Sequence, residues 1–251
     1  DYLEPSNTGE YGQPGTHEPS FHKFHRNTLS RPLESRALRV RRSTYKRTGI
    51  MTEAVQSSYP SSGLITFSFW IKFDRFFNEL EQKLVFEADQ SDNTNAVQMY
   101  FKDGLFHIRL YEAQKPDNTG NRRRYTIPRP PNMSNKWTHF VVQYEIDNID
   151  RTPACYVDSV GKVMTQQAGT SGSGLGGRIA GRLVLMGQDD ISVSQELQGS
   201  MQDFAILSSG VDQHQVNEIY DAHDLATTSV ASSIIDYWKL GNVNVAFGDM
   251  V

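Results

Sequence analysis

Short hydrophobic runs recur along the chain from residue 50 onward, and polar turn residues separate one run from the next. The main runs span 65–73, 84–87, 96–101, 105–111, 136–144, 182–187, 201–207 and 234–240. Runs of this length that are rich in β-branched and aromatic residues are typical of β-strands. They do not alternate with helical segments, so the pattern predicts an all-β fold, a sandwich or a barrel, with antiparallel sheets.

Two pairs of runs are spaced closely enough to predict β-hairpins. The dipeptide Asp103-Gly104 separates the runs 96–101 and 105–111, and such a pair is the strongest short-range hairpin signal. A second hairpin is expected from residues 154–158 and 161–164. Further along, the Gly- and Ser-rich composition of segment 169–177 predicts a flexible, exposed loop. This segment lacks the Gly-Lys-Ser/Thr ending of a phosphate-binding loop, so phosphate binding is not expected there.

One helix is predicted after the last long run. Asp212 is a suitable N-cap, and Gln215 three residues later completes a capping-box pattern. Val216, Ile219 and Tyr220 then fall on one face of the helix. We expect that face to pack against the sheet.

The N-terminal segment differs from the rest of the chain in composition and charge. Residues 1–36 are rich in Gly, Pro, Ser and Asn and show no sustained period, so they cannot offset their ordering entropy alone. Residues 20–47 hold nine basic residues and one acid, whereas residues 48–251 carry a net charge of −8. The sequence therefore predicts a basic, irregular arm at 1–47 and a β-sandwich domain at 48–251.

Aromatic and basic residues spaced along the arm suggest that it orders by docking onto a protein partner; a plain disordered tail is the alternative. The expected docking residues are Tyr2, Tyr11, Phe21, Phe24, Arg26, Arg31, Arg39, Arg41 and Arg42. Residues 37–42 alternate apolar and basic side chains, which predicts a first strand of the sandwich or a charged edge strand. Direct nucleic-acid binding is disfavoured because the rest of the chain is acidic.

Several structural classes are excluded by simple counts. Cys155 is the single cysteine, so an internal disulfide and a cysteine zinc site are both ruled out. Cys155 lies in an apolar run and is expected to be a small core residue. No stretch approaches the roughly 20 consecutive apolar residues of a membrane-spanning helix.

The ordered set of motifs resembles the laminin G-like and pentraxin-like branch of the concanavalin A-like superfamily. The residues that carry the resemblance are 67–72, 137–142, 156–158, 183–187, 197–206 and 216–220, so it covers roughly 63 to 221. The resemblance implies two stacked antiparallel sheets in a jelly-roll arrangement. Trp70 and Trp137 are then expected to pack in the core, where each would bury about 200 Å².

Residues 237–241 resemble, more weakly, segments that accompany such domains in the tail, fibre and capsid-associated proteins of tailed phages. That resemblance implies a virion or extracellular location and a homo-oligomeric assembly in which the arm contacts capsid or tail subunits. We therefore expect a virion-associated structural protein first. A glycan-binding adhesion module, recognising cell-surface glycans, is the alternative.

Catalysis is not expected. Glycoside hydrolysis, known among relatives in the superfamily, needs two facing carboxylates about 5 Å or more apart. The Glu-x-Asp-x-x-Glu pattern of the β-glucanase relatives is missing, and the alternating pairs Glu79/Glu81 and Glu145/Asp147 lie in polar loops or at a strand end. No Ser-His-Asp constellation with a nucleophile elbow is present. A glycoside hydrolase is therefore the least favoured function.

Two sets of residues are the candidate binding positions. A rim patch for a glycan could be lined by Tyr111, Arg122, Arg123, Arg124 and Tyr125. Laminin G-like relatives often bind Ca²⁺, which prefers six to eight oxygen ligands. Two loops suit Ca²⁺ by composition, and their candidate ligands are Asp89, Asp92, Asn93, Asn95, Asp189 and Asp190. Ordinary polar turns are the alternative for both loops.

Overall fold

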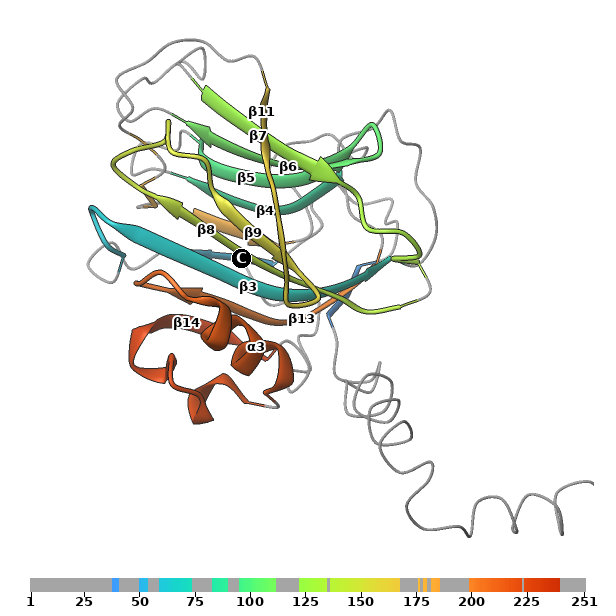
Figure 1. The fold of residues 1–251 in the computed structure, drawn as a ribbon, viewed down its shortest axis with the longest axis vertical. Coiled ribbons are helices and arrows are strands. Elements are labelled where there is room, and N and C mark those ends of the chain that lie inside the picture. Colours follow the sequence, from blue (N-terminus) through green and yellow to red (C-terminus); the bar gives the residue numbers. More distant parts are fainter. Residues whose placement is uncertain are drawn as a thin grey trace, which may run out of the picture. The chain divides into compact units, whose positions relative to one another are not determined.

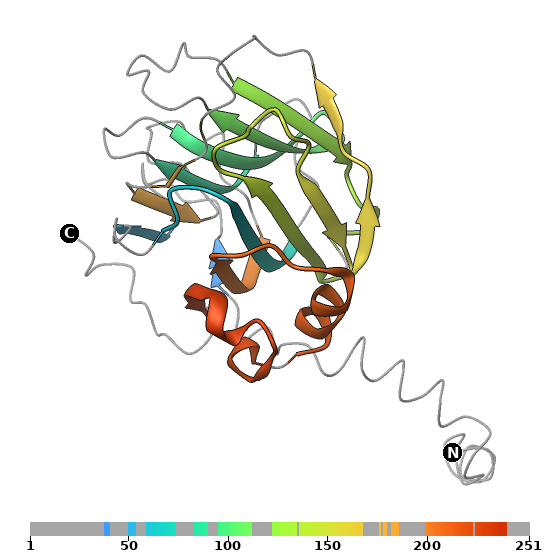
Figure 2. The ribbon, with the colours of Figure 1, turned by 60° about the vertical axis from the view of Figure 1, so that its left-hand side comes forward.

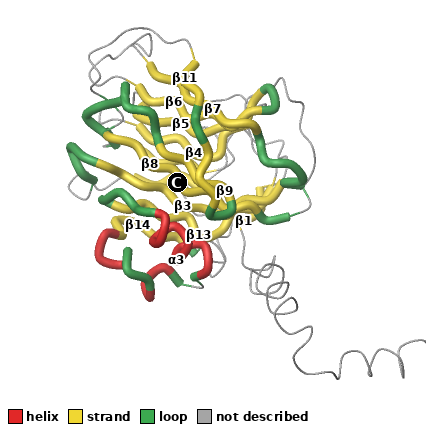
Figure 3. Tube along the Cα trace, in the orientation of Figure 1, coloured by secondary structure: helices red, strands yellow, loops and turns green. Residues whose placement is uncertain are grey.

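The computed structural model describes backbone or side chains of residues 38–40, 50–53, 59–73, 83–89, 95–111, 122–134, 136–167, 176, 178–179, 182–185, 199–222 and 224–239. These residues form two stacked antiparallel sheets of seven strands each, with one α-helix and two 3₁₀ turns. Figure 1 shows the two layers, and Figure 3 shows that the described helical segments gather beside β13 and β14. The predicted all-β jelly-roll sandwich with one short helix is confirmed.

The first sheet, called sheet A, has the order β1-β13-β3-β8-β9-β10, and β14 pairs with β13 beside β1. Its strands are β1 (Leu38–Val40), β3 (Leu64–Phe73), β8 (Thr138–Glu145), β9 (Ala154–Val157), β10 (Val160–Lys162), β13 (Gly199–Leu207) and β14 (Ile234–Trp238). Strand β1 lies within the segment predicted as arm and pairs with the first residues of β13. The alternating segment 37–42 thus contributes a strand of the sandwich. Where the arm ends stays a prediction.

The second sheet, called sheet B, has the order β11-β7-β6-β5-β4-β12-β2. Its strands are β2 (Ile50–Glu53), β4 (Lys83–Asp89), β5 (Asn95–Lys102), β6 (Leu105–Tyr111), β7 (Arg122–Pro128), β11 (Thr165–Gln167) and β12 (Arg182–Leu185). Both predicted hairpins are present, β5–β6 around Asp103-Gly104 and β9–β10 around Asp158-Ser159. In both turns the central residues have positive φ, as two-residue hairpins require. Figure 2 shows β10 and β11 following one another along one side of the sandwich.

The main core lies between the two sheets and is dominated by phenylalanine. Phe204 of β13 is fully buried, and its ring centroid lies 5.1 Å from that of Phe86 in β4. This contact connects the two sheets, because β13 belongs to sheet A and β4 to sheet B. The same ring also contacts Phe67 and Phe69 of β3 and Trp238 of β14. Cys155 belongs to this core, as predicted, and burial raises the pKa of its thiol to about 12.

A second apolar cluster lies on the outer side of sheet A. Helix α3 (Gln213–Asp221) and the 3₁₀ turns η3 (Leu225–Thr227) and η4 (Ala231–Ser233) cover that side, below the sheet in Figure 1. Val216 and Ile219 of α3 are buried there against strand residues such as Val141 and Leu207. The predicted capping box is confirmed, because Asp212 accepts from the backbone of Gln215 while the Gln215 side chain accepts from the backbone of Asp212.

Trp70 is buried, as predicted, but beneath α3 rather than between the sheets. Its ring lies 4.7 Å from that of His139 and 5.2 Å from that of Tyr220, both measured between centroids. The alternation of β3 explains this, since Phe67, Phe69 and Ile71 occupy the inner positions. Trp137 precedes β8 and is only half-buried, so the prediction that Trp137 packs in the core was wrong.

Candidate functional site

The outward side of sheet B carries a continuous set of polar and aromatic side chains, called here the polar face. Strands β5, β6 and β7 send Met99, Ile108 and Tyr125 toward the core, so the residues between such positions point outward. The polar face consists of Glu87, Gln98, Tyr100, His107, Arg109, Tyr111, Arg122, Arg124 and Thr126. Six of these nine residues are buried, Arg109 and Arg124 are half-buried and Arg122 is exposed, which is an unusual degree of burial for polar side chains.

Arg109 stands at the centre of the polar face and is held by three neighbours. Its Nη1 donates to Gln98 Oε1 (2.9 Å) and to the Tyr111 hydroxyl (3.2 Å), and its Nη2 donates to the Tyr100 hydroxyl (2.7 Å). The Tyr111 hydroxyl also donates to Gln98 Oε1, and Gln98 Nε2 donates to Glu87 Oε2. Burial raises the pKa of Tyr111, which therefore stays a neutral donor at physiological pH. The result is a pre-formed network across three strands.

His107 lies beside this network and has one ring nitrogen in use. Its ring stacks on Tyr100, with the centroids 4.6 Å apart and the planes 4° apart. Nε2 is 3.1 Å from the carbonyl oxygen of Lys102, so Nε2 carries the proton and donates. Nδ1 is buried with no hydrogen-bond partner within the described structure. Burial is the main cause that lowers the pKa of His107, and the charges of Arg124 and Arg109 add to it.

Two guanidinium groups of the polar face occupy directly opposite positions. Arg109 of β6 is the register partner of Arg124 of β7. Arg109 Nε is buried and makes no hydrogen bond, and Arg124 is half-buried. Within the described part of the chain, the side chain of Arg124 makes no hydrogen bond and no ion pair. Donor groups of two cations therefore stand side by side without an anionic partner between them.

The residues predicted to line a glycan patch divide between the two sides of sheet B. Tyr111, Arg122 and Arg124 lie on the polar face. Arg123 and Tyr125 point the other way: Arg123 pairs with Asp150, and the Tyr125 hydroxyl donates to the carbonyl of Ile149 at 2.7 Å. These two side chains fasten the turn that follows β8 to β7. Sequence reasoning missed Gln98, Tyr100, His107 and Arg109, although polar residues at every second position of two apolar runs were a visible signal.

The predicted calcium ligands cannot be assembled from the described residues. Asp89 ends β4 and is the register partner of Asn95, which begins β5. Asp92, Asn93, Asp189 and Asp190 lie outside the described residues. Within the described ranges no group of three or more His, Cys, Asp or Glu side chains could hold a metal ion. Calcium binding stays a prediction.

Of the residues predicted to dock the arm, Arg39 lies in β1, opposite Ser200 of β13. The other eight lie outside the described residues. Docking of the arm onto a partner therefore stays a prediction as well.

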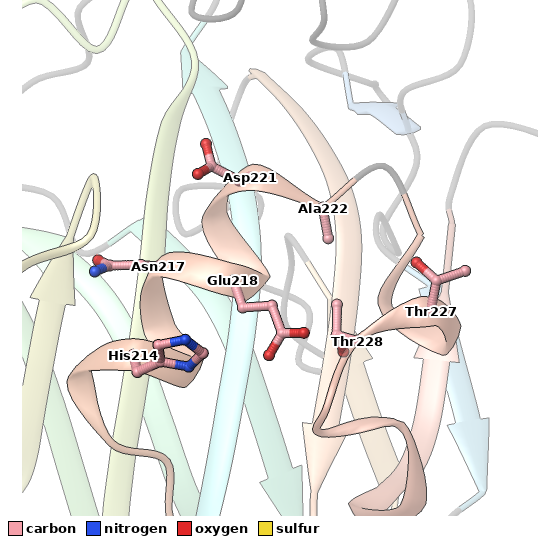
Figure 4. A pocket seen from close by; sticks show the side chains of 7 residues that line it. All are labelled: His214, Asn217, Glu218, Asp221, Ala222, Thr227 and Thr228. Carbon is pink, nitrogen blue, oxygen red and sulfur yellow. The ribbon is translucent and has the colours of Figure 1, made fainter.

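An open pocket of about 530 Å³ lies between α3 and η3 and is a second candidate site. Figure 4 shows Asn217 and Asp221 pointing away from Glu218, whereas the ring of His214 lies on the same side as the Glu218 carboxylate. Glu218 accepts hydrogen bonds from the backbone nitrogen and the hydroxyl of Ser229. These bonds lower the pKa of Glu218 and hold the turn before η4. The Glu218 carboxylate therefore has a structural role, since both of its oxygens hold Ser229.

Ser68 and His139 form a contact that resembles part of a hydrolytic dyad. Ser68 Oγ lies 2.9 Å from His139 Nε2. Both side chains are about 1% exposed, with the rings of Trp70 and Tyr220 packed against His139. A substrate cannot reach this hydroxyl without opening the packing beneath α3, so we assign the pair to the structure of sheet A.

Residues 48–217 match the laminin G-type family model described as the concanavalin A-like lectin/glucanases superfamily. The chain belongs to this superfamily. The resemblance inferred from the sequence motifs is thereby confirmed. Among curated proteins, none matches the sequence. No helix among the described residues is long and apolar enough to cross a bilayer.

Solved structures of similar fold include a heptameric pentraxin of the SAP-like type from Limulus polyphemus. It is 16% identical, with a TM-score of 0.53, over 79% of this chain and 89% of the pentraxin. The receptor-binding domain of botulinum neurotoxin mosaic serotype C/D is 13% identical, with a TM-score of 0.51, over 70% of this chain. The match spans only about two fifths of the toxin domains' own length. At these identities the likeness shows the fold.

Proposed function

We propose that this protein is a glycan-binding module and that the glycan lies on the polar face. The observation that carries the proposal is the Arg109 network, in which one guanidinium is fixed by Gln98, Tyr100 and Tyr111 on the outward side of sheet B. Polar groups held in advance lose little entropy when a ligand binds, and hydroxyl-rich ligands need donors and acceptors in fixed positions. Exposed Arg122 and half-buried Arg124 extend the surface along β7, next to the edge strand β11.

The relatives support a binding role. The superfamily description includes lectins, and the toxin domains of similar fold are described as receptor-binding. The glycan alternative derived from the sequence is therefore the function that we carry forward. A virion location and assembly with capsid or tail subunits stay predictions, because they depend on the arm.

We further propose binding without bond cleavage. Hydrolysis of a glycoside needs one carboxyl group as acid and a second as nucleophile or base. On the polar face as defined above, Glu87 is the one carboxylate, and the amide of Gln98 donates to it. The Glu87 carboxylate accepts from Gln98, which in turn accepts from Arg109, so we assign Glu87 to holding Gln98 in place and not to acid or base catalysis.

A glycan array with matched variants tests the proposal. Arg122→Ala and Arg124→Ala remove side chains of the polar face, whereas Arg151→Ala removes an arginine whose side chain is 63% exposed and pairs with Glu145. We expect the wild type and Arg151→Ala to bind the same glycans and the two polar-face variants to lose them. Mass spectrometry of the bound glycans should show intact chains. Equal binding by all four proteins would refute the proposed site, and shortened glycans would refute binding without cleavage.

A further inference from the structure

We propose that the glycan is acidic and that its carboxylate or sulfate group is held between Arg109 and Arg124. This inference rests on the proposed function, because it specifies the ligand of the same polar face. It depends on three observations: the register of the two arginines, the donor atoms left without partners, and the position of the nearest carboxylate.

The register places two positive charges directly opposite each other. Residues opposite one another in an antiparallel pair have Cβ atoms about 5 Å apart, and like charges at such positions are destabilising. Arg109 and Arg124 hold these positions in β6 and β7. An anion between the two guanidinium groups converts a repulsive pair into two attractive ones.

The unused donor atoms fit the same ligand. Arg109 directs Nη1 and Nη2 toward Gln98 and the two tyrosines, which leaves its buried Nε–H without an acceptor. Within the described residues the guanidinium of Arg124 donates to no acceptor at all. Guanidinium groups bind carboxylate and sulfate-like oxyanions through paired N–H groups, which gives both strength and geometry.

The nearest carboxylate of the polar face cannot substitute for a ligand. The cross-strand order is Arg124, Arg109, Gln98 and Glu87, on β7, β6, β5 and β4. Neighbouring strands are about 4.8 Å apart, so Glu87 lies roughly 14 Å from the strand position of Arg124. Gln98 stands between Glu87 and Arg109 and occupies the Glu87 carboxylate. On the other side of Arg124 the row continues to the neutral Gln167 of β11. Among the described residues of this row, Arg124 is thus the cation without a neutralising carboxylate.

Calorimetric titration with matched acidic and neutral oligosaccharides tests this inference. The probes are a heparin-derived octasaccharide, an oligogalacturonate of eight units, a neutral cello-oligosaccharide and sodium sulfate. We expect both acidic chains to bind more tightly than the neutral chain, with an affinity that falls as salt rises. Arg124→Gln should weaken acidic binding about tenfold or more, the size of a lost charge-assisted hydrogen bond, while Arg151→Gln should not.

The outcomes separate this inference from the proposed function. If the neutral chain binds as tightly as the acidic ones, or if Arg124→Gln binds acidic chains like the wild type, the acidic site is wrong and glycan binding stands. If no oligosaccharide binds, the proposed function itself fails. If sodium sulfate alone competes fully at equal concentration, the site recognises a free anion, and the assignment to an acidic glycan is overturned.

Discussion

Arg109 contacts Tyr100 in two ways: Nη2 donates to the hydroxyl at 2.7 Å, and the guanidinium carbon lies 4.8 Å from the centre of the ring. The ring of His107 stacks on the same tyrosine. Tyr100 therefore orients both the cation and the imidazole of the polar face. Its own burial makes the arrangement rigid, because a fully buried ring cannot change rotamer without opening its surroundings.

Removing the central guanidinium should destabilise the fold. Arg109→Ala leaves Gln98, Tyr100 and Tyr111 with fewer partners in a buried network, and we expect a loss of about 2–3 kcal/mol in the free energy of unfolding. Arg109→Lys should recover only part of it, since an ammonium lacks the planar fork. Urea unfolding measures both. If Arg109→Ala is as stable as the surface variant Arg151→Ala, the network does not stabilise the sheet.

His107 should make stability depend on pH. Because its pKa is lowered in the folded protein, the unfolded chain binds a proton more readily, and stability rises with pH in that interval. Stability should therefore decrease as pH falls below about 6.5, the ordinary pKa of histidine. Thermal unfolding from pH 8 to 5 should show a shallower decrease for His107→Gln. Parallel profiles for the wild type and the variant would remove His107 as the cause.

The capping box at α3 should contribute to stability. Asp212→Ala removes the side chain that accepts from Gln215, and caps of this kind contribute about 1 kcal/mol. Asp221→Ala is the matched control, because Asp221 is exposed in the last turn, where an acid opposes the helix dipole. We expect urea unfolding to show a loss for the first variant and none for the second. The same loss in both would exclude capping as the cause.

Cys155 should be unreactive in the folded protein. Burial raises the pKa of its thiol to about 12, so hardly any thiolate forms at pH 8, and the side chain is about 1% exposed. A thiol-specific disulfide reagent should label the native protein only as fast as it unfolds, and the urea-unfolded chain at once. Rapid labelling of the native protein would contradict the burial of Cys155 in the core.

The strands, both hairpins and the capped helix could be predicted from the sequence because their signals are local. The alternation of apolar side chains identifies a strand, and Asp212 with Gln215 identifies a helix start. Which strand pairs with which is a property of the whole chain, so the opposition of Arg109 and Arg124 could not be seen. The predicted glycan patch was chosen from residues that are neighbours in the sequence. Because successive residues of a strand point to opposite sides, Arg123 and Tyr125 lie on the other side of the sheet from Arg122 and Arg124.

Trp70 shows a related limit. A bulky residue in an apolar run is expected in a core, and it is buried. The strand, however, has two buried sides, because α3 creates a second core on the outer side of sheet A. Trp70 shares its alternation along the strand with Thr66, Ser68 and Lys72, so the pattern of run 65–73 already places it on the opposite side from Phe67 and Phe69. That a helix covers this second side is a property of the whole chain and could not be predicted from the run alone.

Hydrogen-exchange mass spectrometry with and without a saturating heparin-derived octasaccharide tests the central claim most directly. Our account predicts that amide protection increases in β5, β6 and β7, the strands that carry the Arg109 network and Arg124. It also predicts unchanged exchange in α3 and η3, and a clearly smaller increase in protection for Arg124→Gln when the ligand concentration is set near the dissociation constant of the wild type. Protection centred on α3 and η3, with the polar-face strands unaffected, would place binding elsewhere and contradict the account.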